Sequence, residues 1–239
     1  MAAATLYVIG VGPGDPELLT LKGARALGKA GCICVPRGKE KGGSLALSIV
    51  RQAIDLGEKE IIEAYFPMRH VRGTAHGEEL EARWNETVCA VLDRLKRGIH
   101  TAFITIGDPT LYSTFFYLCD RLLEASPELA IEIIPGVSSI NAAAARARLP
   151  LGLGDERIAI LPAPSAADLR TALGAFDTVV IMKVHKVFPT VVAVLAECGL
   201  AGKAVYVSRT GMANELVRRD LASLGTGDLD YFSLVIVRK

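Results

Sequence analysis

Gly10-Val11-Gly12-Pro13-Gly14-Asp15 directly follows the apolar run Leu6-Tyr7-Val8-Ile9. Three alternating glycines after a short buried strand permit a tight turn and the close approach of a ligand to the backbone. The spacing differs from the G-x-G-x-x-G loop of dinucleotide sites, and Pro13 lacks the N–H that a pyrophosphate cradle would use. The acidic residues Asp15 and Glu17 follow and would repel a phosphate. The loop is therefore predicted to receive a neutral or cationic ligand.

The rest of the chain predicts an α/β fold in two domains. Strand-like and helix-like segments alternate over the first half, which is typical of a parallel, layered unit. Three strand-like runs, residues 205–208, 215–220 and 231–238, close the chain without intervening helices and predict a mixed second sheet. A helix is expected over residues 112–123. The linker-like Ala125-Ser126-Pro127-Glu128 places a boundary near residue 126, giving domains 1–126 and 127–239 with a ligand cleft between them.

Composition excludes several classes of protein. The net charge is +1, from 27 basic and 26 acidic residues, so no global field favours nucleic acid. Hydrophobic residues make up 51% of the 239 residues, yet charges or prolines interrupt every candidate membrane span. The apolar surplus is expected to fill buried strands and the interface of a homodimer. The N-terminus shows no secretory signal, so a cytoplasmic location is expected.

The sequence motifs do not indicate a disulfide framework, a metalloenzyme or a hydrolase. The five cysteines are odd in number and scattered, which argues against a disulfide framework. Cys32 and Cys34 have no histidine placed to complete a zinc site, and are interpreted as buried small residues. Neither a Gly-x-Ser-x-Gly elbow nor a His-x-x-x-His pair occurs in the sequence. No metal is therefore expected.

Three later segments of the chain are considered together with the opening loop. They are Ile104-Thr105-Ile106-Gly107-Asp108-Pro109-Thr110-Leu111-Tyr112, Ile134-Pro135-Gly136-Val137-Ser138-Ser139 and Val179-Val180-Ile181-Met182-Lys183. With the opening loop, and in this order, they resemble the tetrapyrrole (corrin/porphyrin) methylases. The resemblance extends over nearly the whole chain. It implies a two-domain fold distinct from the common Rossmann-type methyltransferases, and S-adenosylmethionine as the cofactor.

The resemblance also implies which residues bind the cofactor. Asp108 has a second interpretation as a turn residue or helix N-cap, and Ser138 or Ser139 as the N-cap of a helix. Met182 on pattern alone would belong to the core. The implied cofactor contacts are Pro13, Ile106, Gly107, Asp108, Leu111, Ser138, Ser139, Met182, Arg209 and Thr210.

Within the family, the chain resembles the subgroup that methylates C20 of precorrin-2 or cobalt-factor II in cobalamin biosynthesis. Glu63-Ala64-Tyr65-Phe66-Pro67-Met68 and the residues from Gly107 to Thr114 carry this likeness. It implies a tetrapyrrole substrate, with Tyr112 and Thr114 as substrate contacts.

Three arginines and one acid complete the expected site. Arg37, Arg69 and Arg72 are predicted to pair with substrate carboxylates, the alternative being solvated loops. Asp15 is a candidate acid/base residue because of its place in the opening loop.

Three alternatives stay open at this point. A sibling methylase would act at another ring position, and a diphthine-synthase-like enzyme would methylate a protein side chain. A non-catalytic binding module would keep the fold without cofactor affinity. The sequence does not decide between metal-free and cobalt-loaded substrate.

Overall fold

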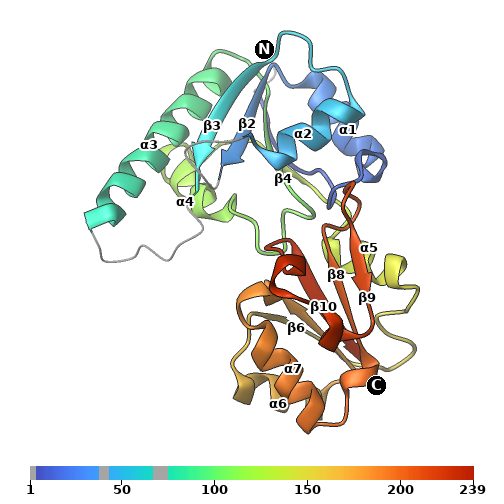
Figure 1. Cartoon of the computed structure of the whole chain (residues 1–239). Coiled ribbons are helices and arrows are strands. Elements are labelled where there is room, and N and C mark those ends of the chain that lie inside the picture. Colours follow the sequence, from blue (N-terminus) through green and yellow to red (C-terminus); the bar gives the residue numbers. More distant parts are fainter. Residues whose placement is uncertain (1–3, 38–42, 67–74) are drawn as a thin grey trace. The chain divides into compact units, whose positions relative to one another are not determined.

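The computed structural model describes residues 4–37, 43–66 and 75–239, which form two compact units, Met1–Ser138 and Ser139–Lys239. Each unit is built around its own five-stranded sheet (Figure 1). The division falls after Ser138 and not near residue 126, because strand β5 pairs in parallel with β1 and completes the first sheet. The α/β fold predicted from the sequence, with a parallel and a mixed sheet, is confirmed.

The N-terminal sheet is wholly parallel, with the strand order β3-β2-β4-β1-β5. Its strands are β1 (Leu6–Gly10), β2 (Cys32–Arg37), β3 (Glu60–Tyr65), β4 (Thr101–Thr105) and β5 (Ile131–Ile134). The helices of this unit are α1 (Leu21–Lys29), α2 (Leu45–Ala53), α3 (Ala75–Lys96) and α4 (Phe116–Ala125), with the 3-10 turn η1 (Pro16–Leu18).

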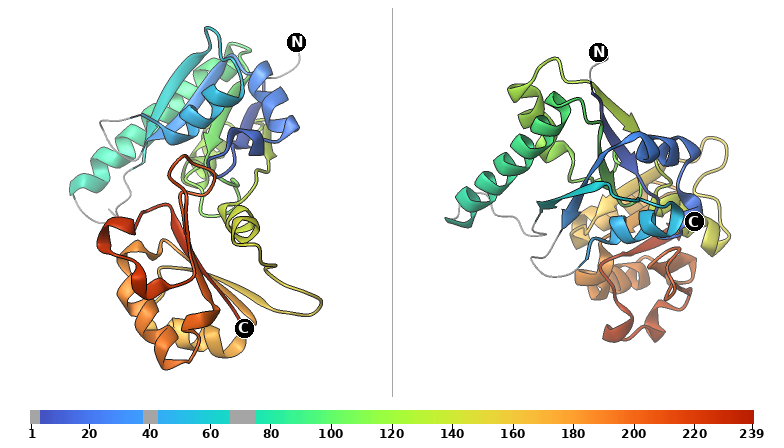
Figure 2. Two further views of the ribbon diagram at one scale, coloured as in Figure 1. Left: turned by 45° about the vertical axis from the view of Figure 1, so that its right-hand side comes forward. Right: turned by 90° about the horizontal axis from the view of Figure 1, so that it is seen from above.

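Apolar side chains on both faces of each central strand explain this layering. Along β1, Tyr7 and Ile9 pack with residues of α1 and α2, whereas Leu6 and Val8 pack with residues of α3 and α4. Alternate residues of a strand point to opposite faces, so both faces must be covered. Helices α1 and α2 cover one face and α3 and α4 the other (Figure 2). Because all five strands are parallel, their carboxyl ends lie at the same edge of the sheet.

The C-terminal sheet is mixed, with the order β6-β7-β10-β8-β9, in which only β6 and β7 are parallel neighbours. Its strands are β6 (Ile158–Pro162), β7 (Thr178–Met182), β8 (Ala204–Ser208), β9 (Leu216–Arg218) and β10 (Ser233–Arg238). The helices are α5 (Ser139–Ala147), α6 (Ala166–Ala175) and α7 (Phe188–Glu197), with the 3-10 turns η2 (Val184–Lys186), η3 (Ala201–Lys203), η4 (Leu221–Ser223) and η5 (Thr226–Asp228).

Helix α4 begins at Phe116 and not at residue 112, where the sequence placed it. Tyr112 has a φ of 55°, in the left-handed region that a right-handed helix does not use. The cysteines are unpaired as expected; Cys32 and Cys34 are buried, but Cys89 and Cys198 are exposed. Among the described residues, no helix has the length and low polarity needed to cross a bilayer.

Candidate functional site

Three glycines bring the ends of β1, β4 and β5 into direct backbone contact. A Cβ atom on Gly10 would lie 2.5 Å from the carbonyl oxygen of Gly107, and one on Gly136 would lie 2.7 Å from the backbone of Gly10. No other residue fits such distances without moving the backbone. We call Gly10, Gly107 and Gly136 the glycine junction. It lies at the carboxyl edge of the parallel sheet, where ligands of open α/β sheets bind.

The opening loop is attached to this junction by two backbone hydrogen bonds. The N–H of Gly107 donates to the carbonyl of Gly12 at 2.8 Å, and the N–H of Gly12 donates to that of Gly107 at 3.3 Å. Both glycines have positive φ, 82° for Gly12 and 72° for Gly107. Pro13 is buried directly after this pair. The first and second sequence motifs are therefore one structural element.

Asp108 connects the second motif to the third. Its Oδ2 accepts a hydrogen bond from the N–H of Gly136 at 2.9 Å, and its Oδ1 accepts one from the N–H of Thr110 at 2.8 Å. The hydroxyl of Thr110 also donates to Oδ1. Burial acts to raise the pKa of Asp108, but these three hydrogen bonds outweigh it and hold the pKa below its ordinary value. Asp108 is thus a charged clamp between two loops, and not the N-cap of α4.

Asp15 has a local structural role. Its Oδ1 accepts a hydrogen bond from the N–H of Glu17 at 2.9 Å and caps η1. Capping alone accounts for an aspartate at this position. The acid/base role that we expected for Asp15 stays a prediction.

The other predicted residues of the N-terminal unit follow the glycine junction along the chain. Ile106 is half-buried against the core, and Leu111 follows the Asp108 clamp. Tyr112 is 47% exposed in its left-handed conformation, and the carbonyl of Thr114 accepts the N–H of Tyr117 at 3.2 Å. Ser138 directly precedes α5, which begins at Ser139. Their roles in binding the cofactor or the substrate stay predictions.

Four predicted cofactor residues belong to the C-terminal unit. Ser139 begins α5, and the other three share one edge of the mixed sheet. Met182 ends β7, and Arg209 and Thr210 follow β8, with β10 between these two strands. The Nε of Arg209 donates to Oδ2 of Asp230 at 2.8 Å, and Thr210 is buried. The edge is therefore a second cluster of predicted residues.

Backbone strain marks the same edge and was not predicted from the sequence. Ala163, Lys183 and Arg209 follow β6, β7 and β8, and have φ values of 43°, 55° and 51°. Side chains other than glycine rarely adopt this conformation, and such residues gather at functional sites. The residue types at these positions carry no signal of it.

Of the predicted substrate residues, Arg37 ends β2 and forms an ion pair with Glu63 of the adjacent β3. Arg69 and Arg72 lie outside the described residues. Within the described part of the chain, no group of histidine, cysteine or acidic side chains is arranged to hold a metal ion.

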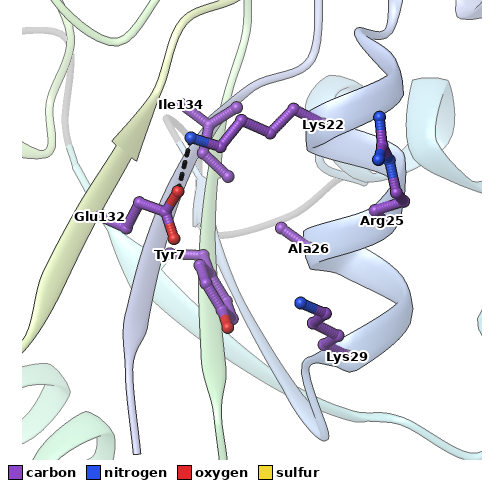
Figure 3. A pocket seen from close by; sticks show the side chains of 7 residues that line it. All are labelled: Tyr7, Lys22, Arg25, Ala26, Lys29, Glu132 and Ile134. Atoms are coloured by element: carbon purple, nitrogen blue, oxygen red, sulfur yellow. Dashed lines mark ion pairs between the residues drawn. The ribbon is translucent and has the colours of Figure 1, made fainter.

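A small pocket of about 300 Å³ lies elsewhere on the N-terminal unit, between α1 and the strands β1 and β5 (Figure 3). Lys22 closes one side of it through an ion pair of 2.6 Å with Glu132. The pocket is lined by Tyr7, Lys22, Arg25, Ala26, Lys29, Glu132 and Ile134. None of the predicted cofactor or substrate residues contributes to it, so it is separate from the glycine junction.

Comparison with known proteins identifies relatives of the whole chain. The profile of the tetrapyrrole (corrin/porphyrin) methylases matches residues 5–225. Cobalt-precorrin-2 C(20)-methyltransferase of Salmonella typhimurium is 38% identical over 237 residues, which cover 98% of this chain and 96% of that protein. Precorrin-2 C(20)-methyltransferase of a Sinorhizobium species is 33% identical, covering 97% of this chain and 94% of the relative.

The fold is shared with solved structures. Uroporphyrin-III C-methyltransferase from Thermus thermophilus, in complex with S-adenosylhomocysteine, matches with a TM-score of 0.66 at 21% identity. The match covers 99% of this chain and 98% of the other.

Proposed function

Because this chain belongs to the tetrapyrrole (corrin/porphyrin) methylase family, we propose that it methylates C20 of precorrin-2 or cobalt-factor II in cobalamin biosynthesis, with S-adenosylmethionine as the methyl donor. The observation that carries the proposal is the 38% identity, over 98% of the chain, to a cobalt-precorrin-2 C(20)-methyltransferase. The lower identity of 33% to the metal-free counterpart favours the cobalt-loaded substrate.

The glycine junction fits a cationic methyl donor. The glycines let three strand ends pack backbone against backbone, and beside them Asp108 adds a carboxylate whose depressed pKa keeps it ionised at neutral pH. When bound, S-adenosylmethionine supplies a methyl group already activated on a sulfonium. The residues proposed to hold it are those that follow the strand ends of both units, from Pro13 and Asp108 to Met182 and Arg209.

The chain's own contribution to the reaction is positioning and the exclusion of water. C20 of the substrate forms a bond to the methyl carbon, the carbon–sulfur bond breaks with its electrons passing to sulfur, and the C20 proton leaves. Asp15 is our candidate for accepting that proton. Arg37, Arg69, Arg72, Tyr112 and Thr114 are proposed to bind the substrate.

Incubation with methyl-labelled donor and either metal-free or cobalt-loaded substrate, followed by NMR location of the label, tests the proposal. Label at C20 supports it, and preference for the cobalt form supports the cobalt-loaded substrate. Label at another ring position would identify a sibling activity. Binding of S-adenosylhomocysteine without transfer to either substrate would contradict the proposal.

We further propose a homodimer in the cytoplasm. The apolar fraction of 51% supports a subunit interface. Light scattering at micromolar concentration tests the dimer, and a monomer would contradict it. Cell fractionation tests the location.

A further inference from the structure

The exposed side chain of Tyr117 is stacked on a second aromatic ring, that of Trp84. The ring of Tyr117, on the first turn of α4, stacks on the indole of Trp84 of α3, with centroids 5.7 Å apart and an interplanar angle of 19°. Tyr117 is nevertheless 58% exposed. An exposed aromatic ring leaves apolar surface in water, which is unfavourable. An exposed ring in a fixed orientation therefore indicates a binding surface.

Trp84 is itself fixed from several sides. Its Nε1 donates to the carbonyl of Tyr65 at 3.1 Å, and its ring lies 5.7 Å from that of Phe66. The guanidinium of Arg121 lies 5.5 Å from the Trp84 ring centre and is oriented by Asn85 at 3.1 Å. Arg121 also pairs with Glu81. The support beneath Tyr117 is therefore preorganised, which lowers the cost of binding a ligand.

The residue that anchors Trp84 lies at the same edge of the sheet as the glycine junction. Tyr65, which anchors Trp84, ends β3 and pairs in register with Arg37 at the end of β2. Strand β4, which leads into Gly107, is the next neighbour of β2. At about 4.8 Å between strands, β3 and β4 are about 10 Å apart. A four-ring macrocycle whose reacting carbon lies at the junction would extend as far as the end of β3, where Trp84 is anchored.

We propose that the outer face of the Tyr117 ring binds the conjugated face of the tetrapyrrole substrate. The inference rests on the proposed function for the identity of the ligand. Tyr117, supported by Trp84, supplies flat contact to the ring system. Stacking of this kind changes an affinity about 3- to 10-fold.

The test compares Tyr117→Ala, Tyr117→Phe and the control Leu123→Ala, which removes another exposed side chain of α4. The chain has a single tryptophan, Trp84, so quenching of its fluorescence by cobalt-loaded substrate, with S-adenosylhomocysteine present, gives a dissociation constant. The same variants are assayed for KM and kcat of methyl transfer and for their thermal unfolding midpoint.

Tyr117→Ala should weaken substrate binding and raise KM about 3- to 10-fold, with kcat and S-adenosylhomocysteine affinity unchanged. Tyr117→Phe should restore both values, and Leu123→Ala should match the wild type. Unchanged substrate affinity in a folded Tyr117→Ala variant would overturn the inference and leave the proposed function standing. A change from dimer to monomer in Tyr117→Ala would overturn it in favour of a subunit contact. Substrate binding without methylation would reject the function alone, and a wild type that binds no tetrapyrrole would reject both.

Discussion

The Oδ2 atom of Asp108 accepts a hydrogen bond of 2.9 Å from the backbone N–H of Gly136, joining loops 28 positions apart in the chain. The other oxygen of the carboxylate is held by Thr110. One side chain therefore fixes the turn after β4 and the turn after β5 relative to each other. Since the opening loop is bonded to Gly107, this single carboxylate stabilises the arrangement of three sequence motifs.

Replacement of this carboxylate should affect both stability and cofactor affinity. Asp108→Ala leaves the N–H groups of Gly136 and Thr110 without their acceptor, which costs about 1 to 3 kcal/mol of unfolding free energy. We expect S-adenosylhomocysteine affinity to fall about tenfold or more, equivalent to about 1.4 kcal/mol. Denaturant unfolding and calorimetry measure the two effects. Thr110→Ala keeps the bond to Gly136 and serves as the control; equal affinity in Asp108→Ala and the wild type would contradict a role for the clamp in binding.

The glycine junction should not tolerate a methyl group. A Cβ on Gly10 would lie 2.5 Å from the carbonyl oxygen of Gly107, which requires a backbone shift. Gly10→Ala should therefore lose cofactor affinity and at least about 1 kcal/mol of stability. Gly28→Ala is the matched control, because a Cβ there meets nothing within 4 Å and the residue lies within α1. That control should gain about 0.5 to 1 kcal/mol. Wild-type titration curves for Gly10→Ala would show that the junction is not part of the donor site.

The lowered pKa of Asp108 predicts how the stability of the protein depends on pH. A carboxyl whose pKa is lowered by folding stabilises the protein fully above its unfolded-state pKa, about 3.9, and loses that contribution as pH falls through the folded value. The stability difference between the wild type and Asp108→Asn should be constant near neutral pH and shrink below about pH 4. Urea unfolding of both proteins between pH 3 and 7 measures it. Other acids with lowered pKa, such as Glu156, are common to both proteins and cancel. A difference that grows on acidification would contradict the assignment.

Local sequence patterns predicted the parallel sheet and the places of its glycine turns, because a buried strand followed by glycine is a short-range signal. They did not predict the hydrogen bond between Asp108 and Gly136, because neither motif carries a signal for a contact between residues 28 positions apart. The domain boundary was expected near residue 126, and the structure divides the chain after Ser138, because this too depends on a contact between distant residues. Pro127 marks the end of α4, but the pairing of β5 with β1 decides which unit the next residues join. The strained edge was missed because Lys183 and Arg209 are not residues that indicate positive φ.

One pair of variants at Arg209 can distinguish the effect of backbone strain from that of the side chain on methyl-donor binding. Its φ of 51° is disfavoured for every residue with a Cβ, and its guanidinium pairs with Asp230 at 2.7 Å. Arg209→Ala and Arg209→Gly both remove the guanidinium, but only glycine relieves the backbone. The glycine variant should therefore be the more stable of the two by about 1 kcal/mol in denaturant unfolding. If the side chain binds the methyl donor as we propose, both variants should lose S-adenosylhomocysteine affinity to the same extent in calorimetry. Equal stabilities would show that the left-handed conformation stores no strain, and wild-type affinity in both variants would remove Arg209 from the donor site.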